Sequence, residues 1–517
     1  MTNKLMKNSI ILVIGNLLFR VGGYINRLLM SRMLGPEGYG LYGLTLPFQG
    51  IFQILSAGGL PPAIAKYVSE YNVKNEHALI KQIIRTSTKY MIFMALILGV
   101  IMLFASDFIA NAIFHKPAVV WPLRVISLIT PFSVVVGAMR GAYQGVYKNE
   151  YTVYNRMCEQ ISTIVFACLF VYVGLYATGA VLGSAFGFIV SAITAVYFYK
   201  KYISGLFETE EDLSLSRKDE LNLLWMLIRF AIPVTITALS EMAIYDVGTL
   251  IIGIFMLSSD VGYYNSADPI ARIPLIISLS ISTVLLPATA EAYTMKNQKL
   301  LQEYVVDCLR YCILTVLPLC VMISVFSEPV ITILFGSNYI KGASVLSILV
   351  IGMSFYSIYM ICSSILQGTG KPKLPMYILI AGTVLNIVLN VIFVNVSGIV
   401  GAGIGTTITT GILMIVILYT VIRNTKISLP WKNILLIVTC NIILMIACII
   451  IPKTIIGAII GFIVGTILYI VCLFLFRVLS ERDIKFFTDY LNRETFLRPY
   501  TEKIIKFIEK HELIYKQ

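Results

Sequence analysis

The chain has 517 residues, of which 58% are hydrophobic and only 13% are charged, and its mean hydropathy is +0.85. This composition lies outside the range of soluble globular proteins and places the chain in a lipid bilayer. The formal net charge of +13 is therefore a matter of membrane topology, and we expect no nucleic acid as partner.

Apolar stretches of about twenty residues follow one another along the chain, each long enough to cross the ~30 Å hydrocarbon core as a helix. The sequence predicts an all-α polytopic membrane protein with about fourteen transmembrane helices. The first carries Arg20 and Arg27 and leads into a Gly/Pro turn, so we expect a spanning helix rather than a cleaved signal peptide. The expected spans are residues 8–30, 38–69, 84–106, 119–144, 155–176, 178–200, 223–256, 264–292, 305–327, 343–367, 375–397, 400–422, 431–451 and 454–478.

Short motifs recur at a nearly constant distance along the first twelve expected spans. The element Gln-Gly-x-x-Lys begins at Gln144 and again at Gln367, 223 residues later. Three further pairs keep offsets of 222 to 225 residues, beginning at Gly40 and Gly262, at Pro62 and Pro287, and at Gly179 and Gly401. Matches in chain order at such spacing indicate a duplication of six helices. Because six is even, both copies enter the membrane in the same direction, as parallel repeats about an axis along the membrane normal.

The duplication predicts the domain organisation. Residues 1–200 form an N-terminal six-helix bundle, and residues 223–422 form its C-terminal repeat. Between them, residues 201–222 contain ETEED and SRKDE and are predicted to be a cytoplasmic linker. Residues 431–478 are two additional helices without a counterpart. Residues 479–517 are predicted to be a cytoplasmic amphipathic tail on the inner membrane surface, although the pattern fits a solvated helix equally well.

The basic residues predict the orientation. With the N-terminus inside, the inner stretches and the tail hold 32 of the 40 Lys and Arg residues. This bias follows the positive-inside rule and predicts an even number of spans in the cytoplasmic membrane, with both termini cytoplasmic. Five charged residues near inner helix ends are interpreted as snorkelling to the interface. They are Lys66, Arg140, Arg156, Glu159 and Arg229.

Cysteine and histidine residues give no sign of a reactive centre. All nine cysteines fall in or at the ends of apolar stretches, which is typical of packing rather than of disulfides. Cys308 and Cys312 are one helical turn apart, but no second pair or nearby histidine completes a metal site. The three histidines are scattered. We therefore expect no metal, no cofactor and no catalytic residues.

Ionisable residues inside apolar spans cost about 3 kcal/mol or more at a helix centre, so they normally face a protein interior or a wet cavity. Arg20 and Arg27 are seven residues apart on one helix face, at ~18 and ~28 Å from the inner boundary. Glu241, in the equivalent helix of the second copy, lies at ~27 Å. Asp246 is near the outer surface, and Arg272 enters from outside to ~12 Å.

Two interpretations of these charges remain open. In the first, opposite charges pair between the copies, for example Arg27 with Glu241, and close their interface. In the second, a hydrated cavity holds an anionic group on Arg20, Arg27 and Arg272. Glu241 and Asp246 are then gate partners or a site for a coupling cation. The planar guanidinium fork suits phosphate. The interpretations are compatible, because a gate pair can open when a ligand competes for the arginines.

Two stretches carry a family resemblance. FRVGGYINRLLMSRMLGPEGYGLY at residues 19–42, followed by ILSAGGLPPAIAKYVSEY at residues 54–71, resembles the multidrug/oligosaccharidyl-lipid/polysaccharide (MOP) exporter superfamily. The chain looks most like the branch of polysaccharide transporters and stage V sporulation protein B-like flippases, with lipid II flippases nearby. The resemblance extends over the whole chain through RGAYQGVYK, the six-plus-six duplication and the two added helices.

The resemblance implies a V-shaped transporter of two bundles around a central cavity. Such a protein moves a polyprenyl-pyrophosphate-linked sugar to the outer leaflet by alternating access. It also implies that Arg20 and Arg27, where relatives place basic residues, contact the pyrophosphate. The stretch LPFQGIFQIL at residues 46–55 lacks the further cavity arginines of lipid II flippases. That departure argues against lipid II itself as the substrate.

The sequence favours a flippase of a lipid-linked oligosaccharide or cell-wall precursor over three other functions. An ion-coupled drug or cation antiporter of the same fold would favour acidic cavity residues. A membrane glycosyltransferase or polymerase would need a polar catalytic region, yet no loop between expected spans exceeds about twenty residues. A lipid scaffold that transports nothing is a further alternative. Because no GxxxxGK[ST] motif occurs, we expect no enzyme but a transporter driven by an ion gradient or the membrane potential, with Na+ or H+ as coupling cation.

Overall fold

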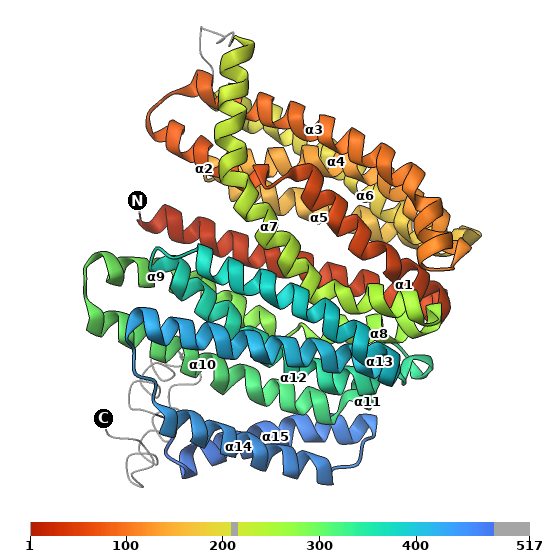
Figure 1. Cartoon of the computed structure of the whole chain (residues 1–517), viewed down its shortest axis with the longest axis vertical. Coiled ribbons are helices and arrows are strands. Elements are labelled where there is room, and N and C mark those ends of the chain that lie inside the picture. The colour runs from red at the N-terminus through yellow and green to blue at the C-terminus, as the bar shows by residue number, and fades with distance from the viewer. Residues whose placement is uncertain (1, 208–215, 480–517) are drawn as a thin grey trace, which may run out of the picture. The chain divides into compact units, whose positions relative to one another are not determined.

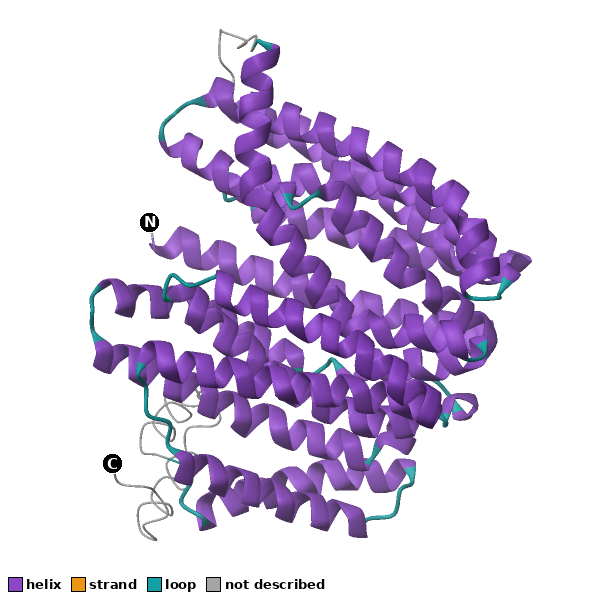
Figure 2. Ribbon diagram, in the orientation of Figure 1, coloured by secondary structure: helices purple, strands orange, loops and turns teal. Residues whose placement is uncertain are grey.

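The computed structural model describes residues 2–207 and 216–479, and within these ranges every element is a helix, a turn or a loop (Figures 1 and 2). The all-α prediction is confirmed for these residues. Residues 208–215 of the predicted linker 201–222 and residues 480–517 of the predicted tail 479–517 lie outside the described residues. The elements are α1 Thr2–Ala57, α2 Leu60–Val73, α3 His77–Phe108, η1 Ile109–Ile113, η2 Pro117–Val119, α4 Val120–Gly145, α5 Asn149–Phe170, η3 Val171–Leu175, α6 Tyr176–Phe198, η4 Tyr199–Ile203, η5 Ser204–Phe207, α7 Arg217–Phe255, α8 Ser258–Ala271, α9 Leu275–Thr294, α10 Gln298–Val325, α11 Ser327–Leu334, η6 Ser337–Tyr339, α12 Gly342–Gly368, α13 Lys373–Thr425, α14 Trp431–Ile450 and α15 Ile455–Leu475.

Ten helical stretches of the described chain are long and apolar enough to cross a membrane. Two of them, Asn149–Phe207 and Lys373–Thr425, have 59 and 53 residues, which is far more than the ~20 residues of one crossing. Each bends back at a glycine with positive φ, Gly174 at 97° and Gly398 at 61°. The polytopic membrane class is thereby confirmed, whereas the total of fourteen spans stays a prediction.

Two predicted spans are wrong as continuous helices. The span 38–69 is divided between α1 and α2 by Gly58 and Gly59, whose φ angles of 54° and 67° end the helix. The span 264–292 is divided between α8 and α9 by a turn at residues 272–274. Pro274 lies at the start of α9, where proline costs no helical hydrogen bond.

The chain forms two compact units. Unit 1 comprises Met1–Pro269, Leu334–Val345 and Met376–Thr409, and unit 2 comprises Ile270–Ile333, Leu346–Pro375 and Thr410–Gln517. These limits come from packing and do not follow the boundaries predicted from the repeat, which stay a prediction. We describe each unit by itself.

In unit 1, α7 packs onto helices of the first predicted copy. Fully buried side chains of α2, α3 and α7, among them Ile64, Val68, Met91 and Leu227, share one core. Helix α1 also contacts α4, α5 and α7. This shared core explains why unit 1 extends beyond the predicted bundle at residues 1–200.

Reciprocal glycine contacts join α1 and α8 within unit 1. A Cβ atom on Gly40 would lie 1.7 Å from the Ser258 carbonyl oxygen, and one on Gly262 would lie 2.0 Å from the Pro36 carbonyl oxygen. Gly262 follows Gly40, and Ser258 follows Pro36, by 222 residues. Contacts that exchange equivalent positions are those expected about a twofold axis. The repeat detected in the sequence therefore places equivalent backbone segments against each other here.

Unit 2 is built around α10. This helix contacts α9, α14 and α15, so the two helices without a counterpart in the repeat pack directly on the second copy. Cys440, Cys448 and Cys472 are buried in their core together with Phe326. All nine cysteines are free thiols, and six of them are buried, as small apolar residues are.

Candidate functional site

The arginine at the outer end of the first predicted span is held inside unit 1. The Nη1 atom of Arg27 lies 3.7 Å from Oδ2 of Asp268 on α8, and the two side chains are 28% and 5% exposed. The sequence analysis gave Glu241 as an example of an acidic partner for Arg27, and this example is wrong, because Asp268 takes that place. A carboxylate as buried as Asp268 needs such a cation, because an unpaired charge in the interior is strongly unfavourable.

Aromatic side chains lie beside the Arg27–Asp268 pair. Tyr39 is almost fully buried, interacts electrostatically with both charged groups and donates its hydroxyl to the carbonyl oxygen of Asn265 at 3.4 Å. Its ring meets the ring of Tyr339 edge to face at 6.0 Å. This layer excludes water from one side of the pair, which strengthens the interaction between its charges.

Arg20 differs from Arg27 in its surroundings. Its side chain is exposed on α1, and its charge acts on the half-buried Glu241 of α7. The charge of Arg20 also acts on Arg156 of α5. The guanidinium of Arg156 lies 5.4 Å from the ring centroid of Phe19. Glu241 thus lies within electrostatic reach of Arg20, whereas Arg27 pairs with Asp268.

The remaining predicted site residues are half-buried. Asp246 lies on α7, in unit 1. Arg272 lies in the turn between α8 and α9, in unit 2, and its carbonyl oxygen accepts from the backbone N–H of Leu275 at 3.1 Å. Arg20, Arg27, Glu241 and Asp246 therefore belong to one compact unit, and Arg272 to the other.

An asparagine pair in α13 forms a polar cluster beside α7. The side-chain amide of Asn386 donates to the carbonyl oxygens of Ala243 and Ile244 at 3.4 and 3.3 Å. Asn390, one turn later, donates to Asn386 and to Thr406. Its own Oδ1 atom is buried and accepts no hydrogen bond. These oxygen atoms lie beside the turn of α7 that carries Asp246.

A second buried network was missed in the sequence. Arg140 donates to Glu159 at 2.6 Å and to Asn155 at 2.8 Å, and Ser191 donates to Glu159 at 2.8 Å. Glu159 is only 5% exposed. Snorkelling of Arg140 and Glu159 was therefore the wrong interpretation. Arg140, Glu159 and Ser191 lie on three different helices, α4, α5 and α6. Spacing along one helix does not reveal which faces of different helices meet.

Lys116 ties the loop before α4 to the end of α7. Its ammonium group donates to the carbonyl oxygens of Gly253 and Met256 at 2.5 and 2.8 Å, so it satisfies acceptors that the helix end leaves free. Burial lowers the pKa of Lys116, and the nearby Asp260 carboxylate partly offsets this effect. The lysine joins segments from both predicted copies.

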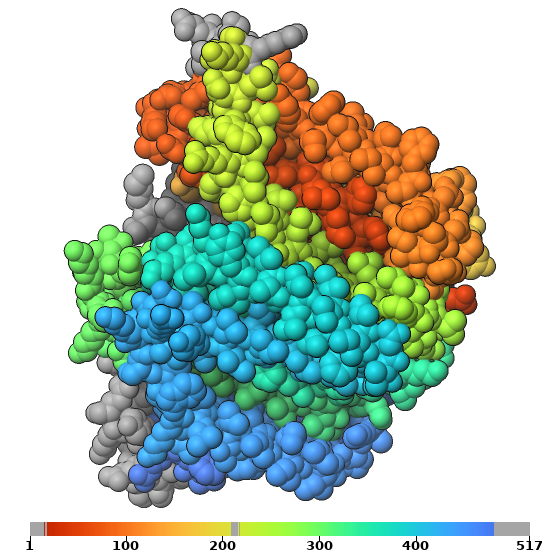
Figure 3. All heavy atoms as spheres, in the orientation of Figure 1, coloured from red at the N-terminus to blue at the C-terminus, as the bar shows by residue number. Residues whose placement is uncertain are grey.

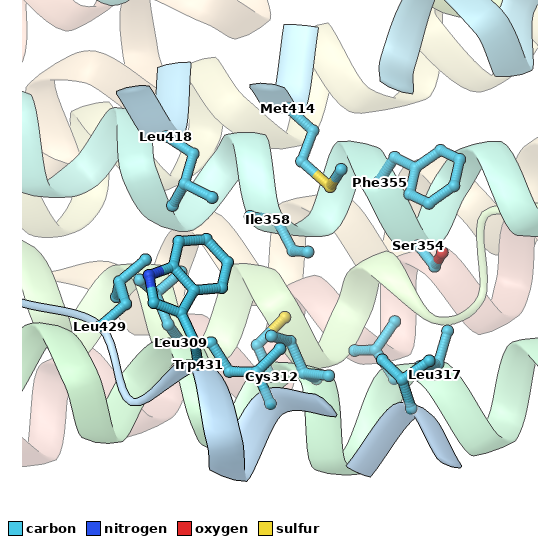
Figure 4. A pocket seen from close by; sticks show the side chains of 14 residues that line it. Leu309, Cys312, Leu317, Ser354, Phe355, Ile358, Met414, Leu418, Leu429 and Trp431 are labelled. Carbon is cyan, nitrogen blue, oxygen red and sulfur yellow. The ribbon is translucent and has the colours of Figure 1, made fainter. Parts of the chain in front are cut away.

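Unit 2 holds an apolar groove of about 230 Å³ between α10, α12, α13 and α14. Figure 4 shows the indole of Trp431 beside Leu429 and Cys312, with Met414 and Leu418 of α13 opposite. Ser354 is the one hydroxyl side chain among its lining residues. Such a surface suits a hydrocarbon chain rather than a polar ligand.

Two protein families match parts of this chain. Residues 5–293 match the family of polysaccharide biosynthesis proteins, and residues 233–392 match the MatE family. The chain belongs to the polysaccharide biosynthesis protein family. Membership of the MOP superfamily, predicted from residues 19–71, is thereby confirmed.

Relatives of similar sequence align with most of this chain. The lipid II flippase MurJ of Bacillus subtilis is 25% identical over 76% of this chain and 77% of its own length. Stage V sporulation protein B of the same organism is 25% identical over 66% of this chain and 68% of its own. A solved structure of lipid II flippase MurJ in an inward closed conformation superposes with a TM-score of 0.73 at 16% identity, covering 90% of this chain and 98% of the other. That likeness establishes the fold.

Proposed function

We propose that the chain is a flippase that carries a polyprenyl-(pyro)phosphate-linked oligosaccharide or cell-wall precursor across the cytoplasmic membrane by alternating access. A relative named as a lipid II flippase supports the transport class, and the family supports a link to polysaccharide synthesis. Both termini are proposed to be cytoplasmic. The protein supplies binding and conformational change, not bond chemistry, and so is not an enzyme.

The observation that carries the proposal is the pair of arginines on one face of α1. Arg27 already has a carboxylate partner in Asp268 at 3.7 Å, which is longer than a tight charged hydrogen bond of about 2.7–2.9 Å. A pyrophosphate offers more acceptor oxygens and more charge than one carboxylate, so it competes for the guanidinium. Exposed Arg20 gives the anion its first contact. Arg272 is proposed as a further contact from unit 2.

The apolar groove of unit 2 offers isoprene units a surface almost without polar groups. Moving the polyprenyl chain within lipid costs little, whereas the sugar and phosphate must be shielded from hydrocarbon. The arginines and the groove thus match the two chemically different parts of one substrate.

A coupling cation, Na+ or H+, is proposed at the polar cluster beside Asp246. Asn390 Oδ1 is a buried oxygen without a hydrogen bond, and Asn386 and Thr406 add further oxygen atoms nearby. Oxygen ligands of this kind suit hard cations. Glu241 is proposed as a gate residue through the charge of Arg20.

The test uses purified protein in lipid vesicles with a fluorescent polyprenyl-pyrophosphate oligosaccharide, whose transfer is read by a membrane-impermeant quencher. Arg20→Ala and Arg27→Ala should each lower transport about tenfold or more, since each loses a charged hydrogen-bond donor to the phosphate. Arg124→Ala is the matched control, because Arg124 forms a half-exposed pair with Asp107. Replacing sodium by choline, at two pH values, tests the coupling cation.

Full transport by both arginine variants would overturn the assignment. If both variants still take up a hydrophobic cation while the labelled lipid does not move, the drug or cation antiporter is favoured instead.

A further inference from the structure

A second cavity of unit 2, of about 390 Å³, lies between α10, the start of α14 and the end of α15. It differs from the apolar groove in its chemistry. Arg310, Lys432 and Arg477 contribute three positive charges to its lining, and Asp307 contributes the one negative charge. The cavity therefore carries an excess of positive charge and favours an anion.

Arg310 lies on α10 and Lys432 on α14, and Arg477 follows the end of α15. Arg310 is 5% exposed and donates to the carbonyl oxygen of Val478 at 3.5 Å, so it fixes the end of α15 against α10. Lys432 and Arg477 are exposed and line the same cavity. The buried Arg310 therefore forms a rigid base of the cavity, and the exposed Lys432 and Arg477 form a rim that a ligand can reach.

The start of α14 adds backbone donors. This helix runs over 20 residues, and Pro430 at its N-cap makes no side-chain cap hydrogen bond. Pro430, Lys432 and Asn433 all line the cavity, so the first turn of the helix borders it. The N–H groups of a first turn have no partner within the helix and favour phosphate groups.

Apolar surface flanks the same cavity. Phe476 lies in its lining, and Trp431, Leu435 and Leu475 are exposed beside it. Helices α14 and α15, drawn in blue in Figure 3, carry many more exposed aliphatic side chains. A ligand at this place meets positive charge at one end and hydrocarbon along its length. Lys432 and Arg477 also belong to the stretches that the charge bias places on the cytoplasmic side.

We propose that this cavity binds the headgroup of an anionic glycerophospholipid from the inner leaflet, with its acyl chains along α14 and α15. Basic pockets between transmembrane helices on the cytoplasmic side take such headgroups. The site belongs to unit 2, whereas the arginines of α1 belong to unit 1, and it does not depend on the proposed transport. It gives the two helices added to the repeat a role, which is to hold a structural lipid against α10.

The experiment measures lipid binding to the full-length protein in detergent by native mass spectrometry. Phosphatidylglycerol is compared with phosphatidylcholine of the same acyl chains. The wild type should retain phosphatidylglycerol about tenfold or more tightly, because each basic residue near the headgroup adds a comparable gain. Lys432→Gln combined with Arg477→Gln should abolish this preference. Lys453→Gln, at an exposed lysine between α14 and α15, should leave it unchanged.

Two further arms separate the sources of phosphate. Inorganic phosphate at millimolar concentration should not displace the bound phospholipid, and polyprenyl phosphate should compete no better in the wild type than in the double variant. An unchanged preference in the double variant would overturn the proposal. Competition by polyprenyl phosphate that the double variant loses would also overturn it, by assigning the cavity to the transported lipid.

Discussion

Arg27 shows how one buried charge selects its partner. The sequence placed an arginine deep in a span and required an acidic group near it, because a lone charge there is costly. Depth along the helix favoured Glu241, but the structure brings Asp268 to 3.7 Å instead. Depth is one coordinate only, whereas the rotation of α8 about its axis decides which side chain faces Arg27.

A double-variant cycle tests this pairing. Arg27→Met should destabilise the protein by about 2 kcal/mol or more, because it leaves the buried Asp268 carboxylate without its cation. Asp268→Asn in the same chain should recover most of that loss. The measurement is the midpoint of thermal unfolding of the purified protein in detergent.

Glu241→Gln provides the comparison for that cycle. Combined with Arg27→Met, it should give simple additivity, because Arg27 pairs with Asp268 and the cation that acts on Glu241 is Arg20. Strong coupling of Arg27 to Glu241, together with none to Asp268, would show that the sequence-based pairing was right after all.

Among the helices, the crossing of α1 and α8 depends on backbone rather than side-chain contact. At Gly40 and Gly262 the partner backbone occupies the place that a Cβ atom would take. Close approach of helices at glycine is a recurrent device of membrane proteins, since it brings dispersion contacts and polar backbone groups together. Each copy of the repeat thus has a glycine at the equivalent position, and both glycines belong to one contact between the helices.

Gly40→Ala and Gly262→Ala should each destabilise the protein by about 1–3 kcal/mol or more, because the helices must separate to admit the methyl group. Gly23→Ala, on the same helix α1, is the control, since no atom lies within 4 Å of its added Cβ. That variant should unfold at the same or a slightly higher temperature, given the better helix propensity of alanine. Equal effects at all three positions, read by thermal unfolding, would argue against a close crossing.

For the whole molecule, the decisive property is its orientation in the membrane. The charge bias places Lys373 on the cytoplasmic side and Lys453 on the opposite side. Both side chains are exposed, so each is suited to labelling. Lys453 lies between the two added helices, so its side of the membrane also decides on which side the tail emerges.

Labelling of introduced cysteines in intact cells tests the orientation. Lys453→Cys should react with a membrane-impermeant maleimide, and Lys373→Cys should react only after the cells are opened. The unmodified chain is the background control, since six of its nine cysteines are buried and the other three are half-buried. Reaction of Lys373→Cys in intact cells would contradict the predicted topology.

Much of this protein follows from its sequence alone. Hydropathy determines the helical membrane class, because an isolated span must satisfy every backbone hydrogen bond within itself. The duplication follows from constant spacing, and the family follows from residues 19–71. These properties are local or periodic, so the order of residues is enough to reveal them.

Only the tertiary structure decided which polar groups meet. It paired Arg27 with Asp268, joined Arg140 to Glu159 and set Asn386 beside α7. It also broke two predicted spans, at Gly58 and before Pro274. Pairing depends on the rotation and crossing of helices far apart in the sequence, and these are fixed by the packing of many side chains at once. Periodicity along one helix carries no record of that packing.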